Sequence, residues 1–327
     1  DVTRYETRLL GPQDPTLGPA THGGNQRASV PLVLERATQD GVAGVRISVQ
    51  GQSEFVAPKE RSGFFSISFP LNTAPIAKQI AGVLRFEVLG LEPLEVMADA
   101  VQQDPRDSMF PMSTPKELAA EHWNEDGPYE TTGWQEQTFA LNDRVQDDAG
   151  FLRDLLEDVD RGEVTLLREM ARVREGHDVT PRLVFYTFTA TDRASHGFFR
   201  YRDKHHPAHK PDLPLMGADP IGQVYRRMDD TVGRVVAKLD PRDTLLICSD
   251  HGFMTWRWAM HVNQWLADEG YLTLTGDAET KSLGTFFTFA EGPDAVDWSK
   301  TQAFAIGLGQ IYINLRGRDE TGIVKPE

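Results

Sequence analysis

The sequence contains a single cysteine, Cys248, among its 327 residues. One cysteine forms no internal disulfide, and it supplies no cysteine cage for a structural zinc ion. The chain also lacks any run approaching the roughly 20 apolar residues of a membrane-spanning helix. Its longest apolar runs are short, like residues 245–248. The sequence therefore predicts neither a disulfide framework nor a membrane span.

Positive charge is in the minority. Lys and Arg number 34 and Asp and Glu number 49, and 34 − 49 gives the formal net charge of −15. Without a basic stripe that neutralises phosphates, non-specific binding to nucleic acid is disfavoured. Hydrophobic residues make up 39% and charged residues 25% of the chain, a mixture that is typical of folded globular proteins. At about 150 residues for one domain, the length allows two domains or one large domain with an insertion.

Both ends of the chain look like the interior of a longer sequence. The sequence begins at Asp1 without an initiator methionine, and it closes at Glu327 soon after a strand-like segment. We expect it to be the interior part of a longer protein. The cellular compartment stays open between a periplasmic or exported location and the cytoplasm, and the sequence indicates no oligomeric state.

Changes of pattern along the chain predict three parts. Residues 1–29 carry much Gly, Pro, Gln and Asn and are predicted to be a linker. Residues 30–110 are predicted to form a β-rich inserted or cap unit. In this part, apolar residues such as those in 45–49 alternate with polar ones, which is typical of half-buried strands. Residues 111–327 change to helical spacing and are predicted to form a partial α/β core.

The α/β core is predicted from alternating strands and helices. Residues 183–188 and 244–248 are apolar, strand-like runs, and a helix opened by Asp219-Pro220 lies between them. Strand, helix and strand in this order predict a mostly parallel sheet that is flanked by helices. The other predicted helices are one opened by Thr114-Pro115 with Glu117 in a capping box, one over residues 151–173, and one over residues 263–269 that ends at Gly270.

Polar side chains follow both predicted core strands. Asp192 and His196 come after the first strand, and Asp250 and His251 come directly after the second. Ligands of such sheets gather at the carboxyl ends of the strands. The spacing of four residues places Asp192 and His196 on one turn of a helix, whereas Asp250 and His251 converge if the chain bends, which Gly252 permits. Carboxylates and imidazoles are ligands that suit Zn²⁺, Mn²⁺ or Fe²⁺.

Each of these pairs also has an ordinary interpretation. An Asp-x-x-x-His sequence is often a helix-capping carboxylate followed by a surface histidine, and Asp-His-Gly is often a turn. The presence of both pairs after two strands that are separated by one helix favours a metal site.

Several segments resemble one known family. Among them, Ser249-Asp250-His251-Gly252-Phe253 is the most specific. The others are Thr191-Asp192-Arg193-Ala194-Ser195-His196, Asp203-Lys204-His205-His206-Pro207, Asn263-Gln264-Trp265-Leu266 with Gly270-Tyr271-Leu272, Asp297-Trp298-Ser299 through Gly307-Leu308-Gly309, and residues 311–318. The chain resembles the alkaline phosphatase superfamily and, within it, the type I phosphodiesterase/nucleotide pyrophosphatase-like proteins. The likeness runs from about residue 110 to the end and is weaker before that.

The resemblance implies a two-metal hydrolase that cleaves phosphate esters. The favoured reaction is that of a phosphodiesterase or nucleotide pyrophosphatase. Asp192 and His196 would hold one divalent ion, and Asp250 and His251 would hold the other. Zinc is the expected metal, with manganese or iron as alternatives. Two such ions about 4 Å apart clamp a phosphoryl group. In this family a Thr or Ser attacks phosphorus, and the covalent intermediate is then hydrolysed.

The chain departs from the family pattern at two places. The nucleophile segment with a further Asp ligand, and a Gly-Asp-His element that brings a third His, do not occur in residues 1–327. The resemblance therefore implies that the nucleophile lies outside this chain and that the chain alone is inactive. The alternatives are a phosphomutase or sulfatase of the same superfamily, or a non-catalytic metal-binding module.

Other histidines are weaker candidates. His261 follows the Asp-His pair by ten positions. It is either the missing third histidine ligand or a residue without a metal-binding role, close to a helix start. His205, His206 and His209 form a local tract, for which a solvated loop is the simpler interpretation.

Overall fold

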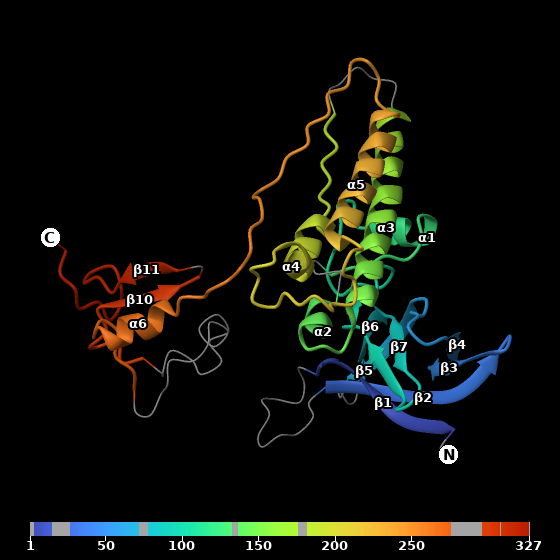
Figure 1. Ribbon diagram of the computed structural model, residues 1–327, viewed down its shortest axis with the longest axis horizontal. Helices are drawn as coiled ribbons and strands as arrows, with labels where there is room; N and C mark the ends of the chain where they lie inside the picture. The colour runs from blue at the N-terminus through green and yellow to red at the C-terminus, as the bar shows by residue number, and fades with distance from the viewer. Residues whose placement is uncertain are drawn as a thin grey trace. The chain divides into compact units, whose positions relative to one another are not determined.

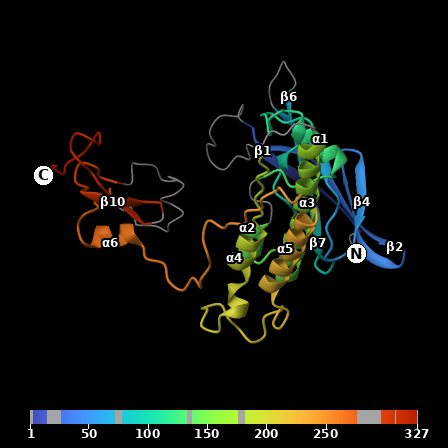
Figure 2. The same cartoon turned by 90° about the horizontal axis from the view of Figure 1, so that it is seen from above.

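The computed structural model describes residues 3–14, 27–71, 78–132, 137–175, 182–275, 296–307 and 309–326. Contacts within the chain define two compact units, Asp1–Thr255 and Trp256–Glu327, and each is described by itself. Figures 1 and 2 give two views of the ribbon. None of the helices in the described ranges is both long enough and apolar enough to cross a membrane.

The first part of the larger unit is built from antiparallel strands. Three sheets have the strand orders β1-β2-β3-β4, β5-β6-β9 and β7-β8. The strands are β1 (Arg4–Gln13), β2 (Arg27–Gln39), β3 (Val42–Val49), β4 (Gln52–Val56), β5 (Phe65–Leu71), β6 (Lys78–Leu84), β7 (Phe86–Gly90), β8 (Glu95–Ala98) and β9 (Gln102–Gln103).

Alternating side chains explain why these segments form strands. In β3, Val45, Ile47 and Val49 are buried and their neighbours are more exposed, which confirms the strand predicted there. These side chains pack with Phe65, Phe86 and other apolar residues of the sheets into one hydrophobic core. The boundary between residues 30–110 and the rest stays a prediction.

The linker predicted over residues 1–29 is corrected in part. Residues 4–13 form β1, which pairs with β2 from Arg4 opposite Glu35 to Gln13 opposite Arg27. A strand that owes its place to pairing with a distant segment is hard to detect from local composition. Residues 15–26 of the predicted linker lie outside the described residues.

The second part of the larger unit is helical. Its helices are α1 (Leu118–Glu125), α2 (Thr138–Asn142), α3 (Asp148–Glu175), α4 (Ala190–Arg202) and α5 (Pro220–Val236). The buried faces of α3 and α4 meet at Phe151 and Phe198, whose ring centroids lie 5.8 Å apart in a T-shaped arrangement. Ile221 and Val224 of α5 join the same core, and Figures 1 and 2 both show α5 alongside α3.

The helix starts agree with the sequence in one case and differ in another. Asp219 caps α5 as predicted, because its carboxylate accepts a hydrogen bond from the Gly222 N–H. The capping box predicted at Thr114 is wrong: α1 begins at Leu118 without a side-chain cap from Glu117. The hydroxyl of Ser113 instead accepts a hydrogen bond from the backbone N–H of Ala119.

The two predicted core strands are not formed. Residues 183–188 and 244–248 belong to no sheet among the described residues, and all strand pairs within the named sheets are antiparallel. Their apolar side chains stay in contact with solvent, with Leu183 87% and Leu246 82% exposed. A parallel strand requires neighbours on its edges, and no described strand lies beside these segments to supply them. The mostly parallel sheet therefore stays a prediction.

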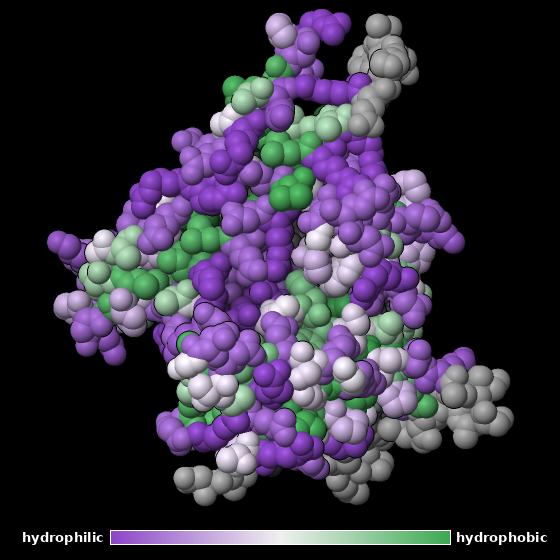
Figure 3. All heavy atoms as spheres, turned by 90° about the vertical axis from the view of Figure 1, so that its right-hand side faces the viewer, coloured by the Kyte–Doolittle hydropathy of each residue, from purple (hydrophilic) through white to green (hydrophobic). Residues whose placement is uncertain are grey.

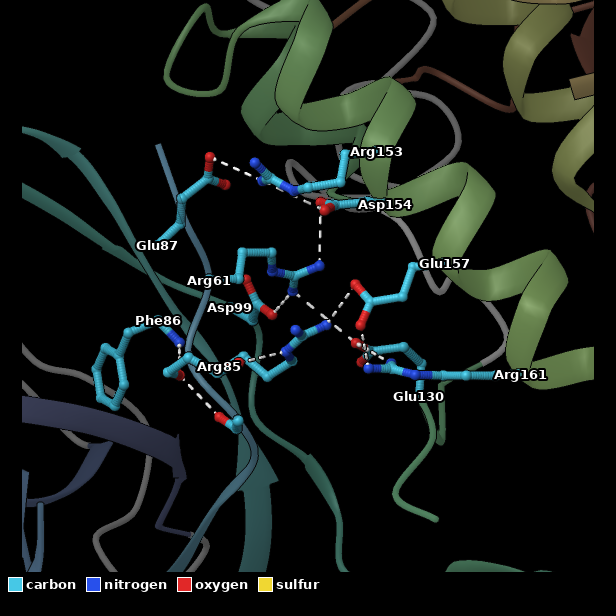
Figure 4. A network of polar contacts seen from close by, with 12 residues as sticks. Arg61, Arg85, Phe86, Glu87, Asp99, Glu130, Arg153, Asp154, Glu157 and Arg161 are labelled. Carbon is cyan, nitrogen blue, oxygen red and sulfur yellow. Dashed lines mark hydrogen bonds and ion pairs between the residues drawn. The ribbon is translucent and has the colours of Figure 1, made fainter. Parts of the chain in front are cut away.

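A buried network of charged side chains joins the β-strands to α3 (Figure 4). At its centre Arg61 pairs with Asp99, and a terminal nitrogen of Arg61 lies 3.0 Å from the Asp154 carboxylate in α3. A buried charge is costly unless it is paired, so these contacts fix α3 against the sheets. We call this group the Arg61 network; its members are Arg61, Arg85, Glu87, Asp99, Glu130, Arg153, Asp154, Glu157 and Arg161.

The Arg61 network has five carboxylates for its four guanidinium groups. Burial raises the pKa of Asp99, and Arg61 opposes this rise. The carboxylates of Glu130 and Asp154 add to the rise, so the pKa of Asp99 reaches about 7. The Oδ1 atom of Asp99 is buried without a hydrogen-bond partner in the described part of the chain. We therefore expect the excess negative charge to be neutralised by a proton on Asp99 below about pH 7.

The smaller unit, Trp256–Glu327, has its own small core. It contains α6 (Val262–Asp268) and an antiparallel pair, β10 (Ala303–Ile306) with β11 (Gln310–Ile313). Leu266 and Ala305 belong to its hydrophobic core, and the side chain of Asn263 bonds to both backbone groups of Ala305. The helix predicted over residues 263–269 is confirmed, and Gly270 follows it with a φ of +78°.

Candidate metal centre

The first pair of predicted ligands lies on one turn at the start of α4. Asp192 Oδ2 and His196 Nε2 are 3.7 Å apart, as the spacing of four residues predicts. Asp192 stands in the first turn, where a carboxylate is favoured by the helix dipole. Phe198 and Ala194 are fully buried on the opposite face, so the helix is anchored while its two polar side chains reach solvent.

The second pair approaches the first from residues 249–253. His251 Nε2 lies 3.7 Å from Asp192 Oδ1 and 3.5 Å from Asp250 Oδ2. The four predicted residues therefore come together in one place. Gly252 does not adopt a positive φ, so the approach does not depend on the conformational freedom that we expected it to provide. The site is open, since the side chains of Asp192 and Asp250 are 32% and 87% exposed.

The electrostatics of the site centre on Asp192. Its two oxygens face the imidazoles of His196 and His251, one each, and Arg193 Nη1 lies 3.4 Å from Oδ2. His251 Nδ1 donates a hydrogen bond to the Gly252 carbonyl at 2.9 Å. This bond raises the pKa of His251, and the carboxylates of Asp250 and Asp192 add to the rise.

The same hydrogen bond also selects a tautomer. A neutral imidazole that donates from Nδ1 keeps its lone pair on Nε2, and ligating histidines usually donate their other nitrogen in this way. The Nε2 atom of His251 is the one that faces Asp192 and Asp250. His251 is therefore arranged as a ligand would be.

The separations between the donor atoms resemble those between the ligands of one zinc ion. Two donors that both lie about 2.1 Å from a tetrahedral zinc ion are about 3.4 Å apart. The 3.5 Å and 3.7 Å separations found here are close to this value. In the described ranges, no group of three or more His, Cys, Asp or Glu side chains is arranged to hold one ion. The residues thus fit a metal as pairs of ligands and not as a complete shell.

The weaker histidine candidates belong to the other unit or make local contacts. His261 belongs to the smaller unit, where it precedes α6. His206 Nδ1 accepts a hydrogen bond from the Ala208 N–H, and His209 Nδ1 donates one to the Arg200 carbonyl at 2.7 Å. These contacts support the interpretation of residues 205–209 as a loop.

Two contacts at the site were missed by reasoning from the sequence. Phe253 lies against both imidazoles, with ring centroids 4.8 Å from His196 and 5.7 Å from His251. The hydroxyl of Thr255 donates a hydrogen bond to Asp203, just after α4. The only signal for Phe253 is its place directly after Asp250-His251-Gly252, and nothing local marks the pairing of Thr255 with Asp203.

Comparison with known proteins assigns the chain to a family. The model of the family described as type I phosphodiesterase / nucleotide pyrophosphatase matches residues 37–325, which include both ligand pairs. The chain belongs to this family, which is consistent with the alkaline phosphatase superfamily, and the resemblance is confirmed. No curated protein and no solved structure matches the chain. Family membership implies an alkaline phosphatase-like α/β fold.

Proposed function

We propose that this chain is the metal-binding part of a phosphodiesterase of the nucleotide pyrophosphatase type. Membership of the family supports hydrolysis of phosphate esters as the general activity. The proposal of a metal site rests on the convergence of Asp192, His196, Asp250 and His251. Their imidazole nitrogens lie 3.5 to 3.7 Å from the neighbouring carboxylate oxygens. Two carboxylates and two imidazoles that meet from separate segments are a donor set for divalent ions.

In this proposal, Asp192 and His196 hold one ion, and Asp250 and His251 hold the other. When bound, the two ions would supply the positive charge that stabilises a phosphoryl group during displacement. Zinc is the proposed metal, with manganese or iron as alternatives. The gap of 3.7 Å between Asp192 and His251 makes the two pairs neighbours. The Gly252 carbonyl holds the proton of His251 at Nδ1 and leaves Nε2 for the ion.

The substrate is proposed to be a small phosphodiester or nucleotide-like ester. With a net charge of −15, the chain repels a phosphate ester unless local positive charge offsets the field. Arg193, whose Nη1 atom lies 3.4 Å from Asp192, is a cation beside the ligands. We propose that the nucleophile is a Thr or Ser outside residues 1–327, so that these residues alone turn over substrate slowly or not at all.

The test is hydrolysis of bis-p-nitrophenyl phosphate by the full-length protein. We expect turnover to stop after treatment with EDTA and to return with Zn²⁺ or Mn²⁺. His251→Gln should lower kcat/KM by more than about 100-fold, because losing a ligand costs more than losing a neighbour of one. The matched control is His205→Gln in the exposed loop, which should leave kcat/KM unchanged. Full turnover in EDTA would overturn the proposal, and equal turnover by residues 1–327 would place the nucleophile inside them.

A further inference from the structure

Phe253 is the apolar side chain that touches both candidate histidines. Its ring lies edge-on to His196, with centroids 4.8 Å apart and planes at 89°, and it is tilted at 59° to His251 with centroids 5.7 Å apart. Phe199 of α4 stacks against Phe253, with centroids 6.1 Å apart and planes at 23°. Phe253 is half-buried, and its ring packs against side chains of α4 and against His251.

Among the described residues, the two imidazoles are held by few other contacts, of which the hydrogen bond from His251 Nδ1 to the Gly252 carbonyl is one. The two histidine side chains are 55% and 56% exposed, so few packing contacts select among their rotamers. They stand on different segments, and residues 249–253 belong to no strand in the described part of the chain. Edge-to-face contacts between rings have a preferred geometry, so they restrict orientation in a way that an aliphatic contact does not.

We propose that Phe253 is a positioning residue, which holds the imidazoles of His196 and His251 in the orientation that directs both Nε2 atoms toward Asp192. This inference rests on the proposed function, since it gives the orientation a purpose in metal binding. The ring acts on the two ligand pairs at once, so its loss weakens both ion positions together. The hydrogen bond of Thr255 to Asp203 holds the same segment but touches neither imidazole.

The first test uses the full-length protein without metal, labelled with ¹³C and ¹⁵N at histidine, and measures the three-bond couplings to Cγ that report the χ1 torsion. Replacing Phe253 by Leu removes the ring but keeps an apolar side chain, so the couplings of His196 and His251 should both change toward values averaged over several rotamers. Phe253→Tyr keeps the ring and should leave both couplings near their original values. Phe110→Leu, at an exposed phenylalanine outside the site, is the matched control and should change neither. If Phe253→Leu leaves the couplings of both histidines unchanged, the inference is overturned.

The second test is calorimetric titration of the same proteins with Zn²⁺. Loss of a group that orients metal ligands typically lowers metal affinity by about 10- to 100-fold, so the Kd of Phe253→Leu should rise by that factor. Phe253→Tyr should restore the affinity, which a role in packing alone does not require. A Kd for Phe253→Leu equal to that of the wild type would overturn the inference.

The two tests separate the inference from the proposed function. If the wild-type protein binds no zinc, the proposed metal role fails, while the histidine couplings still decide whether Phe253 orients the rings. Circular dichroism checks that Phe253→Leu is folded. If it is not, Phe253→Met, which also lacks a ring but has a longer and more adaptable side chain, takes its place with the same expected results.

Discussion

The Arg61 network and the candidate metal centre both gather acidic side chains with cationic or titratable partners, but they differ in burial and spacing. Arg61, Asp99 and Asp154 are almost completely buried and pair at hydrogen-bonding distances (Figure 4). Asp192, His196 and His251 are partly exposed and stay 3.7 Å apart. The charged groups of the Arg61 network are paired with one another, whereas those of the metal centre remain accessible to a ligand.

Solvent explains the difference. A buried ion must find a partner, because removing it from water costs several kcal/mol unless pairing offsets the loss. Exposed charged groups do not need a protein partner, because water solvates them and can occupy the space between them. Hydrophilic side chains predominate on the face shown in Figure 3, as expected for a chain of net charge −15. Charge on the surface is therefore common in this molecule, and its convergence in one place is what distinguishes the metal centre.

The largest effect is expected from Arg61→Met. The change leaves Asp99 and Asp154 buried without their shared cation, and breaking a buried pair in this way typically costs about 3–5 kcal/mol. Urea denaturation followed by circular dichroism measures the free energy of unfolding. A loss below about 1 kcal/mol would show that the network adds little to stability and that its burial does not set it apart from the metal centre.

The second-largest effect is expected from pH, which should change the free energy of unfolding through Asp99. The pKa of Asp99 is raised from 3.8 to about 7 in the folded chain, so the folded state binds this proton more tightly than the unfolded state. The stabilisation is complete below about pH 4 and is lost as the pH rises through about 7, by an amount on the order of a few kcal/mol. Asp99→Asn should remove this part of the pH dependence. Identical slopes of unfolding free energy between pH 4 and 7 in both proteins would contradict the assignment.

At the metal centre, a substitution should alter the response to zinc rather than the stability of the protein. Asp192→Asn removes a charge that is partly in solvent, and such changes usually stay within about 0.5 kcal/mol. Zinc at about 100 times its Kd stabilises a protein by about 2.7 kcal/mol. Thermal unfolding with and without Zn²⁺ should show this gain in the wild type and a smaller gain in Asp192→Asn. Equal gains would remove Asp192 from the ligand set.

The smallest effect is expected at an exposed ion pair. Arg4 lies between Glu6 and Glu35 on the surface of the β1–β2 pair. Because solvent screens such pairs, Arg4→Gln should leave the unfolding midpoint in urea unchanged within error. A loss comparable to that of Arg61→Met would mean that burial is not what separates structural charges from available ones in this protein.

The sequence predicts those parts of the fold that local pattern encodes. The alternation of Val45, Ile47 and Val49 and the capping of α5 by Asp219 are visible in a few neighbouring residues. The Arg61 network is not visible in this way, because Arg61 and Asp154 are far apart along the chain and hydropathy assigns both to the surface. The same limit applies to β1, which depends on its distant partner β2.

The four candidate residues converge for a reason other than the predicted one. The sequence predicts that they follow two parallel strands, and those strands are not formed among the described residues. The residues nevertheless converge, since α4 holds Asp192 and His196 and the ring of Phe253 joins the second segment to this helix. Motif spacing identified the donors, whereas the contact that brings them together required the structure.

Metal binding by these four residues is tested most directly by a crystal structure of the full-length protein with zinc, in which anomalous scattering locates the ions. We predict one peak within about 2.0–2.2 Å of donor atoms of Asp192 and His196, and a second within the same distance of Asp250 and His251. The two peaks should lie about 4 Å apart. Zinc bound at other residues, with these four side chains free of metal, would contradict this prediction.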